Sequence, residues 1–440
     1  IQDVLPDKPD LIVLPEVCDR PSGMSNEEVR AYYSQRGDKA VNGLARIAKQ
    51  NNCYIAAGIA RDDASGKRYN SCVMIDRQGN LWFSNNHNLG LIQFKRQDIH
   101  HQTDASEVRS VLFDSQGRLW TGYRSGKLSV LSAHGLQYLR ANGQLGETSI
   151  PFTTHIYCLY EDSRKNLWIG SKGDGLYRLT SEGKLTHYIH NPTDPNSICS
   201  NQVYDVYEDY QGRIWIGTFE KGISLFTETD DGQPRFKNAG SQLTRYPLKD
   251  FHKVRRITET ADSTIIVSAS NGMVVFKDDN EPWEDIKFFA HKHLPGDPKS
   301  LLTSDVMQTF VASDSTIYIA TVGGGLQRIK AQNLKTNNKP LNLENISHLI
   351  RNCGTIFGIT EDNMGNIWIG CENSLNMYDV KRNRVWCYGP EYLGEDTRLA
   401  EALPAYHPQT DKMVLATSSG TIDFECQRLQ KDSFVPPLVF

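Results

Sequence analysis

Several features are missing from this 440-residue sequence, and each absence narrows the class of protein. No apolar run approaches the roughly 18–20 residues that a membrane-spanning helix needs. No Lys/Arg run forms a track for polyanions and the formal net charge is only −4, so we do not expect nucleic acid as a partner. The nine Cys have no CxxC or metal-ligand spacing. We therefore expect mostly buried Cys, no metal and no cofactor.

The first residues, IQDVLPDKPD, lack the pattern of a signal peptide, and the sequence begins without Met. We therefore expect a fragment or a processed product. What the sequence does have is 39% hydrophobic residues, which is enough for a sizeable core. Because the chain exceeds the usual domain size of roughly 100–200 residues, its length favours a repeat array, a large all-β unit or several domains.

A repeated pattern dominates the sequence from about residue 76 onward. The segment EDYQGRIWIGTFEKGISLF begins at Glu208 and has near-copies at Glu161 and Glu361. With Trp215 as the anchor, a large apolar residue recurs about every 50 residues after one shorter first step. These anchors are Trp82, Trp120, Trp168, Ile266, Tyr318, Trp368 and Leu415.

Each repeat has the pattern of four short strands. An alternating run, Val203 to Tyr207, ends in an acidic turn with Gly212, a second run contains Trp215, and two further runs follow. Four antiparallel strands repeated at this period describe one blade of a β-propeller. We therefore predict an all-β fold, a propeller of about seven four-stranded blades from about Arg109 onward, with residues 81–107 as an extra or closing hairpin.

The anchor residue is expected to fill the space between neighbouring blades. Because Ile266, Tyr318 and Leu415 replace Trp in three repeats, bulk rather than indole chemistry is the expected requirement. The GGG stretch at Gly323 to Gly325 is interpreted as a turn rather than a phosphate-binding loop, since no helix follows it.

Residues 1 to about 80 follow a different pattern. PDLIVLPE, Pro9 to Glu16, predicts a buried strand, and SNEE, Ser25 to Glu28, is typical of a capping box at the start of a helix. Apolar residues at helical spacing lie between Ala40 and Ala48, and two strand-like segments follow, Cys53 to Ala60 and Asn70 to Asp76. This β–α–β–β order predicts a short, incomplete α/β segment ahead of the propeller.

The repeats resemble the two-component-regulator propeller repeat, which is found in sensor regions of hybrid two-component systems of Bacteroidetes-type bacteria. The shared pattern is V..I.ED..GNLWIGT..GGL.RF, and the connectors NPTDPNSICSNQVYDVYED and HLPGDPKSLLTSDV are also similar. The resemblance covers residues 76 to 440, and DSFVPPLVF from Asp432 is similar to the start of the immunoglobulin-like module that follows such propellers.

The resemblance implies a periplasmic, non-catalytic module that senses glycan fragments and signals to a histidine kinase. The implied partners are an oligosaccharide, a preceding propeller and the following immunoglobulin-like module, and we expect a homodimer of the full-length protein. The expected domains are residues 1–80, 81–431 and 432–440.

The N-terminal segment resembles the first third of the carbon-nitrogen hydrolase (nitrilase) superfamily, whose strand ends in LPE and which continues to GI…YNS.VVID..G. The resemblance implies that Glu16 matches the general base. That chemistry also needs a Lys for the oxyanion and a Cys nucleophile. Neither is recognisable downstream, so we interpret Glu16 as a remnant without catalytic function.

Three classes of function therefore stay open: a ligand sensor, a protein-interaction scaffold, and a hydrolase fragment fused to a propeller. For a sensor, the ligand site is expected where the innermost strands begin, at the mouth of the central channel. Arginines pair with acid groups and aromatic rings cover sugar faces, which favours an acidic oligosaccharide. The candidate site residues are Arg109, His155, Tyr157, Tyr204, His252 and Arg255.

Overall fold

The computed structural model describes residues 1, 4–15, 18, 23–36, 39–62, 68–84, 89–92, 99–278, 281–323, 325–337, 339–350, 353–394 and 396–429. The chain divides into two compact units, Ile1–Gln97 and Asp98–Phe440. No helix among the described residues is both long and apolar enough to cross a membrane. The expected start of a following module at 432–440 lies outside the described residues.

The first unit is a five-stranded sheet with two helices. Strands β1 and β2 are parallel, the other neighbouring pairs are antiparallel, and the order is β1-β2-β3-β4-β5. The elements are β1 (Leu11–Val13), α1 (Asn26–Arg36), α2 (Lys39–Gln50), β2 (Tyr54–Asp62), β3 (Arg68–Ile75), β4 (Leu81–Ser84) and β5 (Leu89–Ile92).

The capping box predicted at the start of α1 is present. The Ser25 backbone N–H donates to Glu28 Oε2 at 2.8 Å, and the Glu28 N–H donates to Ser25 Oγ at 3.3 Å. Helix α2 buries Val41 and Leu44 in the same apolar cluster as Ile55 of β2. The helical pattern of the sequence therefore corresponds to two helices rather than one.

The boundary between the units lies later than the 80/81 division expected from the sequence. Strand β4 pairs with β3, with Trp82 opposite Met74, and β5 pairs with β4. Because this hairpin extends the N-terminal sheet, the division falls at Gln97/Asp98. Trp82 therefore anchors no blade, although its indole N–H donates to Asp76 at 3.2 Å, as in the blades.

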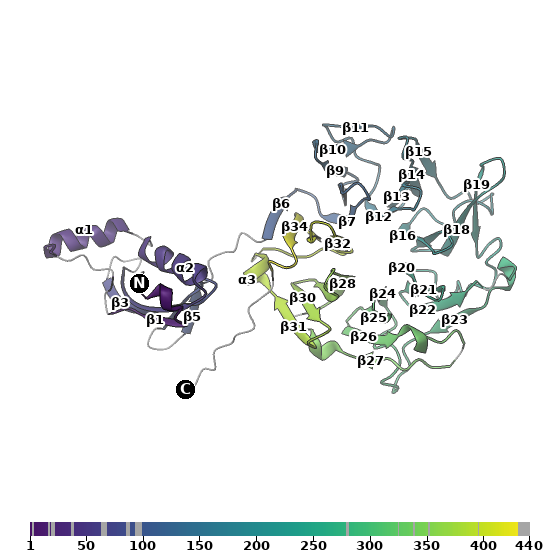
Figure 1. Cartoon of the computed structure of the whole chain (residues 1–440). Helices are drawn as coiled ribbons and strands as arrows, with labels where there is room; N and C mark the ends of the chain where they lie inside the picture. Colours follow the sequence, from purple (N-terminus) through teal and green to yellow (C-terminus); the bar gives the residue numbers. More distant parts are fainter. Residues whose placement is uncertain are drawn as a thin grey trace. The chain divides into compact units, whose positions relative to one another are not determined.

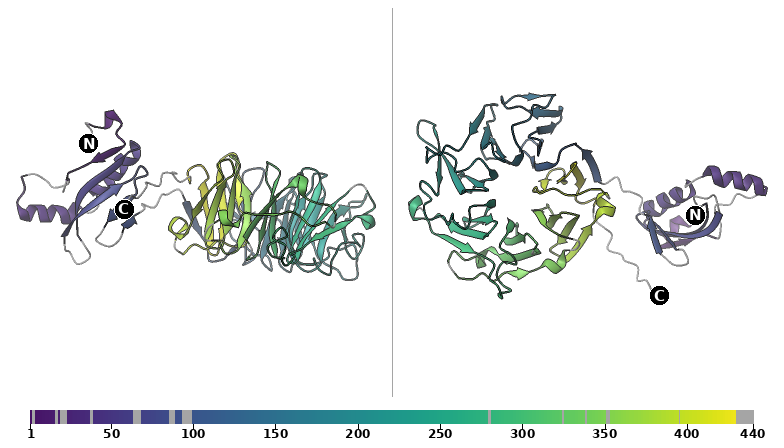
Figure 2. Two further views of the ribbon diagram at one scale, coloured as in Figure 1. Left: turned by 90° about the horizontal axis from the view of Figure 1, so that it is seen from below. Right: turned by 180° about the vertical axis from the view of Figure 1, so that it is seen from behind.

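The second unit is a ring of seven antiparallel sheets around one axis (Figure 1), and Figure 2 shows the same ring from its edge and from the other face. We number the blades 1 to 7 along the chain. Neighbouring innermost strands contact each other around the ring, including β32 with β7. The innermost strands are β7 (Val108–Phe113), β12 (Ile156–Glu161), β16 (Val203–Glu208), β20 (Val254–Glu259), β24 (Val306–Val311), β28 (Ile356–Glu361) and β32 (Ala405–His407).

The other strands follow outward in each blade. The second strands are β8 (Leu119–Tyr123), β13 (Leu167–Ser171), β17 (Ile214–Thr218), β21 (Thr264–Ala269), β25 (Thr316–Thr321), β29 (Asn366–Cys371) and β33 (Lys412–Thr417). The third strands are β9 (Leu128–Ser132), β14 (Leu176–Leu179), β18 (Gly222–Glu228), β22 (Gly272–Lys277), β26 (Gly325–Lys330), β30 (Ser374–Asp379) and β34 (Gly420–Glu425). The outer strands are β10 (Gly135–Leu139), β15 (Leu185–Tyr188), β19 (Pro234–Asn238), β23 (Phe288–His291), β27 (Glu344–Asn345), β31 (Arg384–Tyr388) and β6 (Ile99–Thr103).

The ring is closed by a strand from its own beginning. Strand β6 pairs with β34 of blade 7, with His101 opposite Ile422, and blade 1 has a short fifth strand, β11 (Leu145–Gly146). The predicted propeller of about seven four-stranded blades is therefore confirmed. Of the residues 81–107 expected as one extra or closing hairpin, only β6 closes the ring, while β4 and β5 belong to the first unit.

The Trp anchors fill the space between blades, but bulk is not their whole role. Trp215 of blade 3 packs against Phe276 of blade 4 in one buried cluster. In addition, its indole N–H donates to Asp209 at 2.8 Å, and blades 1, 2 and 6 repeat this bond at 2.7–2.8 Å. Where Ile266, Tyr318 or Leu415 replaces Trp, the residue six positions earlier is Thr, Ala or Gln instead of Asp. The expectation of bulk alone was therefore wrong for the Trp blades.

In blades 2, 3 and 6 the Glu of the repeated Glu-Asp pair bonds a serine of the preceding blade. Glu208 of blade 3 accepts hydrogen bonds from the backbone N–H and the hydroxyl of Ser163 in blade 2, at 2.7 and 2.6 Å. Glu161 and Glu361 hold Ser115 and Ser313 in the same way. The repeated sequence therefore has two structural roles, since Asp holds its own turn and Trp while Glu holds the neighbouring blade.

Candidate functional site at the ring axis

A β-bulge occurs at the same position in six innermost strands. In blades 1 to 6 the pairing with the second strand skips the second residue, as between Ile156 and Cys158 in β12. A bulge leaves its extra residue outside the ladder and re-aims its side chain. The bulged residues are Arg109, Tyr157, Tyr204, Arg255, Met307 and Phe357. Four of the six predicted site residues are thus placed by one repeated backbone irregularity.

Two further sets of positions surround these bulges. The residue after each second strand donates its N–H to a carbonyl just ahead of the innermost strand, as Arg124 does to Glu107 at 2.8 Å and Phe219 does to Gln202 at 3.0 Å. Around the ring the donors are Arg124, Lys172, Phe219, Ser270, Val322, Glu372 and Ser418. The acceptors are Glu107, His155, Gln202, Lys253, Asp305, Thr355 and Arg398.

Arg109 is held by three side chains from three blades. Its guanidinium donates to Glu107 at 2.7 Å, to Glu401 at 2.9 Å and to the Tyr157 hydroxyl. Burial opposes the charge of Arg109, but Tyr157, Glu107 and Glu401 outweigh burial and raise its pKa. Glu107 also pairs with Arg124 at 3.0 Å, and the two arginines hold the pKa of this partly buried carboxylate below its usual range.

Arg255 joins the same network from the other side of the ring. It donates to both oxygens of Asp305, at 2.9 and 3.0 Å, and to Glu401 at 3.3 Å. Glu401 precedes β32 in blade 7, whereas Arg255 is in blade 4, and these blades are not neighbours. The Arg109–Glu401–Arg255 bridge therefore crosses the mouth of the channel.

Three aromatic rings from blades 2 and 3 form a continuous stack beside this bridge. The ring centroids of Tyr157 and Tyr204 lie 4.1 Å apart, and those of Tyr204 and Phe219 lie 4.4 Å apart at 12°. Arg109 lies over Tyr157 at 4.4 Å and Arg255 over Phe219 at 5.4 Å. Tyr157 and Tyr204 are only 7% and 5% exposed, so most of their ring surface is already covered. The stack orients the arginines more than it offers an open sugar platform.

The two predicted histidines differ in their surroundings. Burial lowers the pKa of His155, and the nearby cations Lys172, Arg124 and Arg109 lower it further. These shifts favour the neutral form of the His155 imidazole, which lies near three cations. The His252 carbonyl accepts the Gly222 N–H at 2.9 Å, which places this residue at the same end of blade 4 as Arg255.

Glu401 was not predicted, and the local backbone explains how it reaches the axis. Blade 7 has an innermost strand of only three residues, so the segment Leu399–Pro404 takes the place of a longer strand. This segment packs directly on Gly358 of β28, where a Cβ would lie 2.6 Å from Pro404 Cδ and 3.0 Å from the Ala402 carbonyl oxygen. Glycine at 358 is therefore required for the close approach of the residues that flank Glu401.

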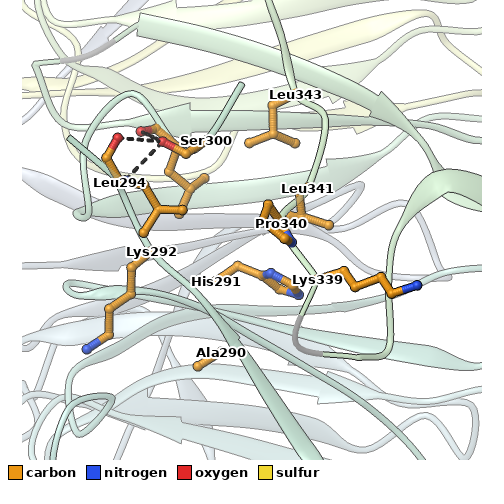
Figure 3. Close-up of a pocket in the computed structure, with 10 residues that line it drawn as sticks. Ala290, His291, Lys292, Leu294, Ser300, Lys339, Pro340, Leu341 and Leu343 are labelled. Carbon is orange, nitrogen blue, oxygen red and sulfur yellow. Dashed lines mark hydrogen bonds between the residues drawn. The ribbon is translucent and has the colours of Figure 1, made fainter. Parts of the chain in front are cut away.

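A pocket of about 240 Å³ lies elsewhere in the ring, between β23 and the segment before β27 (Figure 3). Its apolar lining includes Leu294, Leu301, Leu341 and Leu343. The His291 imidazole contacts the Lys335 carbonyl at 3.2 Å, and the Lys292 ammonium bonds Asp250 at 2.8 Å. This pocket is mainly apolar, and His291 and Lys292 already have partners, so the charged network at the mouth is the stronger candidate site.

The residues of the first unit that could serve a hydrolase do not form a recognisable catalytic site among the described residues. Glu16 lies outside the described residues. Burial raises the pKa of the Cys53 and Cys18 thiols, which disfavours the thiolate that a nucleophile requires. No group of three or more His, Cys, Asp or Glu among the described residues is placed to hold a metal ion.

Comparisons with known families agree with the two parts of the chain. The model of the two component regulator propeller matches residues 150–173 and 197–220, which lie in blades 2 and 3. The carbon-nitrogen hydrolase model matches residues 1–134, so this match continues past the first unit into blade 1. Both resemblances inferred from the sequence are therefore confirmed. No curated protein matches the chain.

Solved structures share the propeller fold. The extracellular domain of a protein described as a hybrid two component system from B. thetaiotaomicron has a TM-score of 0.56 at 17% identity, over 83% of this chain and 52% of that chain. PorZ of Porphyromonas gingivalis, a component of the type-IX secretion system, has a TM-score of 0.54 at 11% identity, over 84% of this chain and 52% of PorZ. Virginiamycin B lyase from Staphylococcus aureus has a TM-score of 0.53 at 15% identity, over 74% of this chain and 97% of the lyase. At such identities these likenesses concern the fold alone.

Proposed function

We propose that the propeller is a non-catalytic, glycan-sensing module of a hybrid two-component regulator, with its ligand site at the mouth of the channel. The observation behind the proposal is the convergence of Arg109, Tyr157, Tyr204 and Arg255, all from bulge positions, on one network around Glu401. A propeller that only packs needs no charged groups from blades 1, 4 and 7 in mutual contact. Hydrogen-bonding groups at a junction between several blades suit recognition of a polyhydroxyl ligand.

The proposed location is the periplasm. A disulfide between Cys353 and Cys371 joins the start of blade 6 to its second strand, and disulfides persist in oxidising compartments. The extracellular domains among the structural neighbours support the same assignment. We further propose that the full-length regulator supplies a preceding propeller and a following immunoglobulin-like module, and that it is a homodimer.

A hydrolase function is supported only by the family match of residues 1–134. Burial raises the pKa of Cys18 and Cys53, which disfavours the thiolate that a nucleophile requires at these two positions. We therefore place the function in the propeller.

The test is calorimetric titration of the full chain with a panel of neutral and acidic oligosaccharides. We expect at least one member to bind, and we expect Arg255→Gln to weaken that binding by roughly tenfold or more because it removes charged hydrogen bonds near the ligand. Arg178→Gln is the matched control, since Arg178 is similarly buried and pairs with Glu228 at 2.8 Å away from the mouth. If no glycan binds, or if the two variants behave alike, the proposal fails.

A further inference from the structure

We propose that Glu401 sets the charge specificity of the mouth, because its own carboxylate occupies the place where an acidic group of a ligand would bind. The wild-type site then selects uncharged oligosaccharides and rejects acidic ones. This inference rests on the proposed glycan-sensing function and replaces the acidic ligand favoured by the sequence.

The geometry around Glu401 is that of a bound carboxylate. One oxygen, Oε2, accepts from Arg109 at 2.9 Å, and the other, Oε1, accepts from Arg255 at 3.3 Å. The two guanidinium groups come from blades 1 and 4, so they approach a single acid from opposite sides. A carboxylate is the natural partner of two converging guanidinium groups.

The charges of the network are already balanced without a ligand. Besides Glu401, Arg109 has Glu107 at 2.7 Å and Arg255 has both oxygens of Asp305. The third arginine, Arg124, also pairs with Glu107. Within these ion pairs three arginines face three carboxylates, and an incoming acid would add a fourth negative charge beside them. Like charges at this distance disfavour binding, which is how a site rejects a wrong partner. Lys172 and Lys253 lie outside these pairs, over the rings of Tyr157 and Phe219 at 5.5 and 5.6 Å.

At the centre of the network the acids are more exposed than the arginines, whereas Arg124 at its edge has a side chain that is 62% exposed. The side chains of Glu401 and Asp305 are 27% and 34% exposed, whereas those of Arg109 and Arg255 are 10% and 16% exposed. A ligand that reaches Arg109 and Arg255 therefore meets the more exposed carboxylates of Glu401 and Asp305 beside them. These oxygens accept hydrogen bonds from sugar hydroxyls and repel uronate or sulfate groups.

Glu401 differs from a carboxylate that only supports the fold. Asp205 lies in the bulged strand β16, is 8% exposed, and accepts the Ile257 N–H at 2.7 Å, so it links two blades. Glu401 lies outside the strands and accepts hydrogen bonds from two site arginines, Arg109 and Arg255. Its role is therefore in the chemistry of the mouth.

The test compares an oligogalacturonide with its methyl ester, which has the same sugar without the charge. Calorimetry on the full chain gives the ratio of acid to ester affinity for the wild type and for Glu401→Gln, whose side chain has the same shape. We expect this ratio to rise by roughly tenfold or more in Glu401→Gln, because the substitution removes one negative charge and the neutral amide is more easily displaced from the two guanidinium groups by an acid of the ligand. A sulfated oligosaccharide run in parallel distinguishes a general anion effect from a uronate-specific one.

The matched control is Glu220→Gln. Glu220 is an exposed carboxylate at the same end of blade 3, where it bonds Ser200 at 2.8 Å and contacts neither arginine. Exposed Lys172 and Lys253 attract anions equally in all variants, so they cancel from the comparison. In the double variant Glu401→Gln/Arg109→Gln, the ratio of acid to ester affinity is expected to show no rise over the wild type.

The outcomes separate this inference from the proposed function. If the wild type binds a neutral glycan and Glu401→Gln gains no acid binding, the specificity assignment is wrong and the sensing function stands. If the wild type binds no glycan but Glu401→Gln binds the acid through Arg109, the assignment stands and the sensing function fails. A wild type that binds the acid more tightly than the ester contradicts the assignment outright.

Discussion

Asp209 accepts the indole N–H of Trp215 at 2.8 Å, six residues further along the chain and across the turn that joins β16 to β17. The other oxygen of the same carboxylate accepts the backbone N–H groups of Gln211 and Arg213, both at 3.0 Å. One buried acid therefore closes the turn and fixes the ring that fills the space between blades 3 and 4. The pair explains why Asp and Trp recur together at this spacing.

Replacing Trp215 by Ala is expected to reduce the free energy of unfolding by about 3–5 kcal/mol, since a large buried ring is lost. Asp209→Ala is expected to reduce it by about 1–3 kcal/mol, because the indole N–H and the turn lose their acceptor. Denaturant unfolding of the second unit measures both. Trp386, which is half-buried on β31, is the control. If Trp386→Ala reduced the free energy of unfolding as much as Trp215→Ala does, the role assigned to Trp215 would be wrong.

Glu208 and Ser163 are expected to be energetically coupled across the boundary between blades 2 and 3. A double-mutant cycle with Glu208→Gln and Ser163→Ala is predicted to give a coupling of about 0.5–1.5 kcal/mol, the usual range for such hydrogen bonds. Glu182, an exposed carboxylate that accepts a hydrogen bond from the hydroxyl of its neighbour Ser181 at 2.7 Å, provides the control pair. Additive effects of the two substitutions would show that the contact does not fasten the blades.

Asp205 is expected to make stability depend on pH. Burial raises its pKa from 3.8 to about 6 in the folded chain, so the folded state binds more protons between these two values. Stability due to this residue therefore falls as pH rises from about 4 to 6 and is level above that range. The difference between wild type and Asp205→Asn isolates this effect. We predict that the free energy of unfolding of the wild type rises by up to ~3 kcal/mol relative to that of Asp205→Asn as pH falls from 7 to 4. A difference between the two proteins that stays constant with pH would contradict this prediction.

The chain is predicted to have no amidase or nitrilase activity. Burial raises the pKa of Cys18 and Cys53, and no Lys or Cys of the hydrolase pattern is recognisable after Glu16. Assays with simple amides and nitriles should show no turnover above background. Turnover that disappears in Glu16→Gln would overturn this prediction.

Much of the fold follows from one repeat, and the errors occur where the repeat is irregular. The period of Trp anchors was sufficient to predict about seven blades, because each blade must bury its faces against neighbours. The same regularity located Arg109, Tyr157, Tyr204 and Arg255 at equivalent positions, now seen to be bulges.

Glu401 was missed because blade 7 lacks the Glu-Asp turn and has only a short innermost strand. Its contact with Arg255 joins residues 146 positions apart and depends on closure of the whole ring. The spacing of six residues between Asp and Trp was visible in every Trp repeat and would have predicted the indole bond. The arginines favoured an acidic ligand because two of their carboxylate partners, Asp305 and Glu401, come from other blades and could not be recognised as partners in the sequence.

The most direct test of the central claim is hydrogen–deuterium exchange of the full chain with and without the best-binding glycan of the panel. The account predicts slower exchange in the bulge segments that contain Arg109, Tyr157, Tyr204 and Arg255 and in the segment around Glu401. It predicts no change around the apolar pocket of Leu294, Leu301 and Leu341. Protection at that pocket with an unchanged mouth would contradict the claim that this propeller reads its ligand at the ring axis.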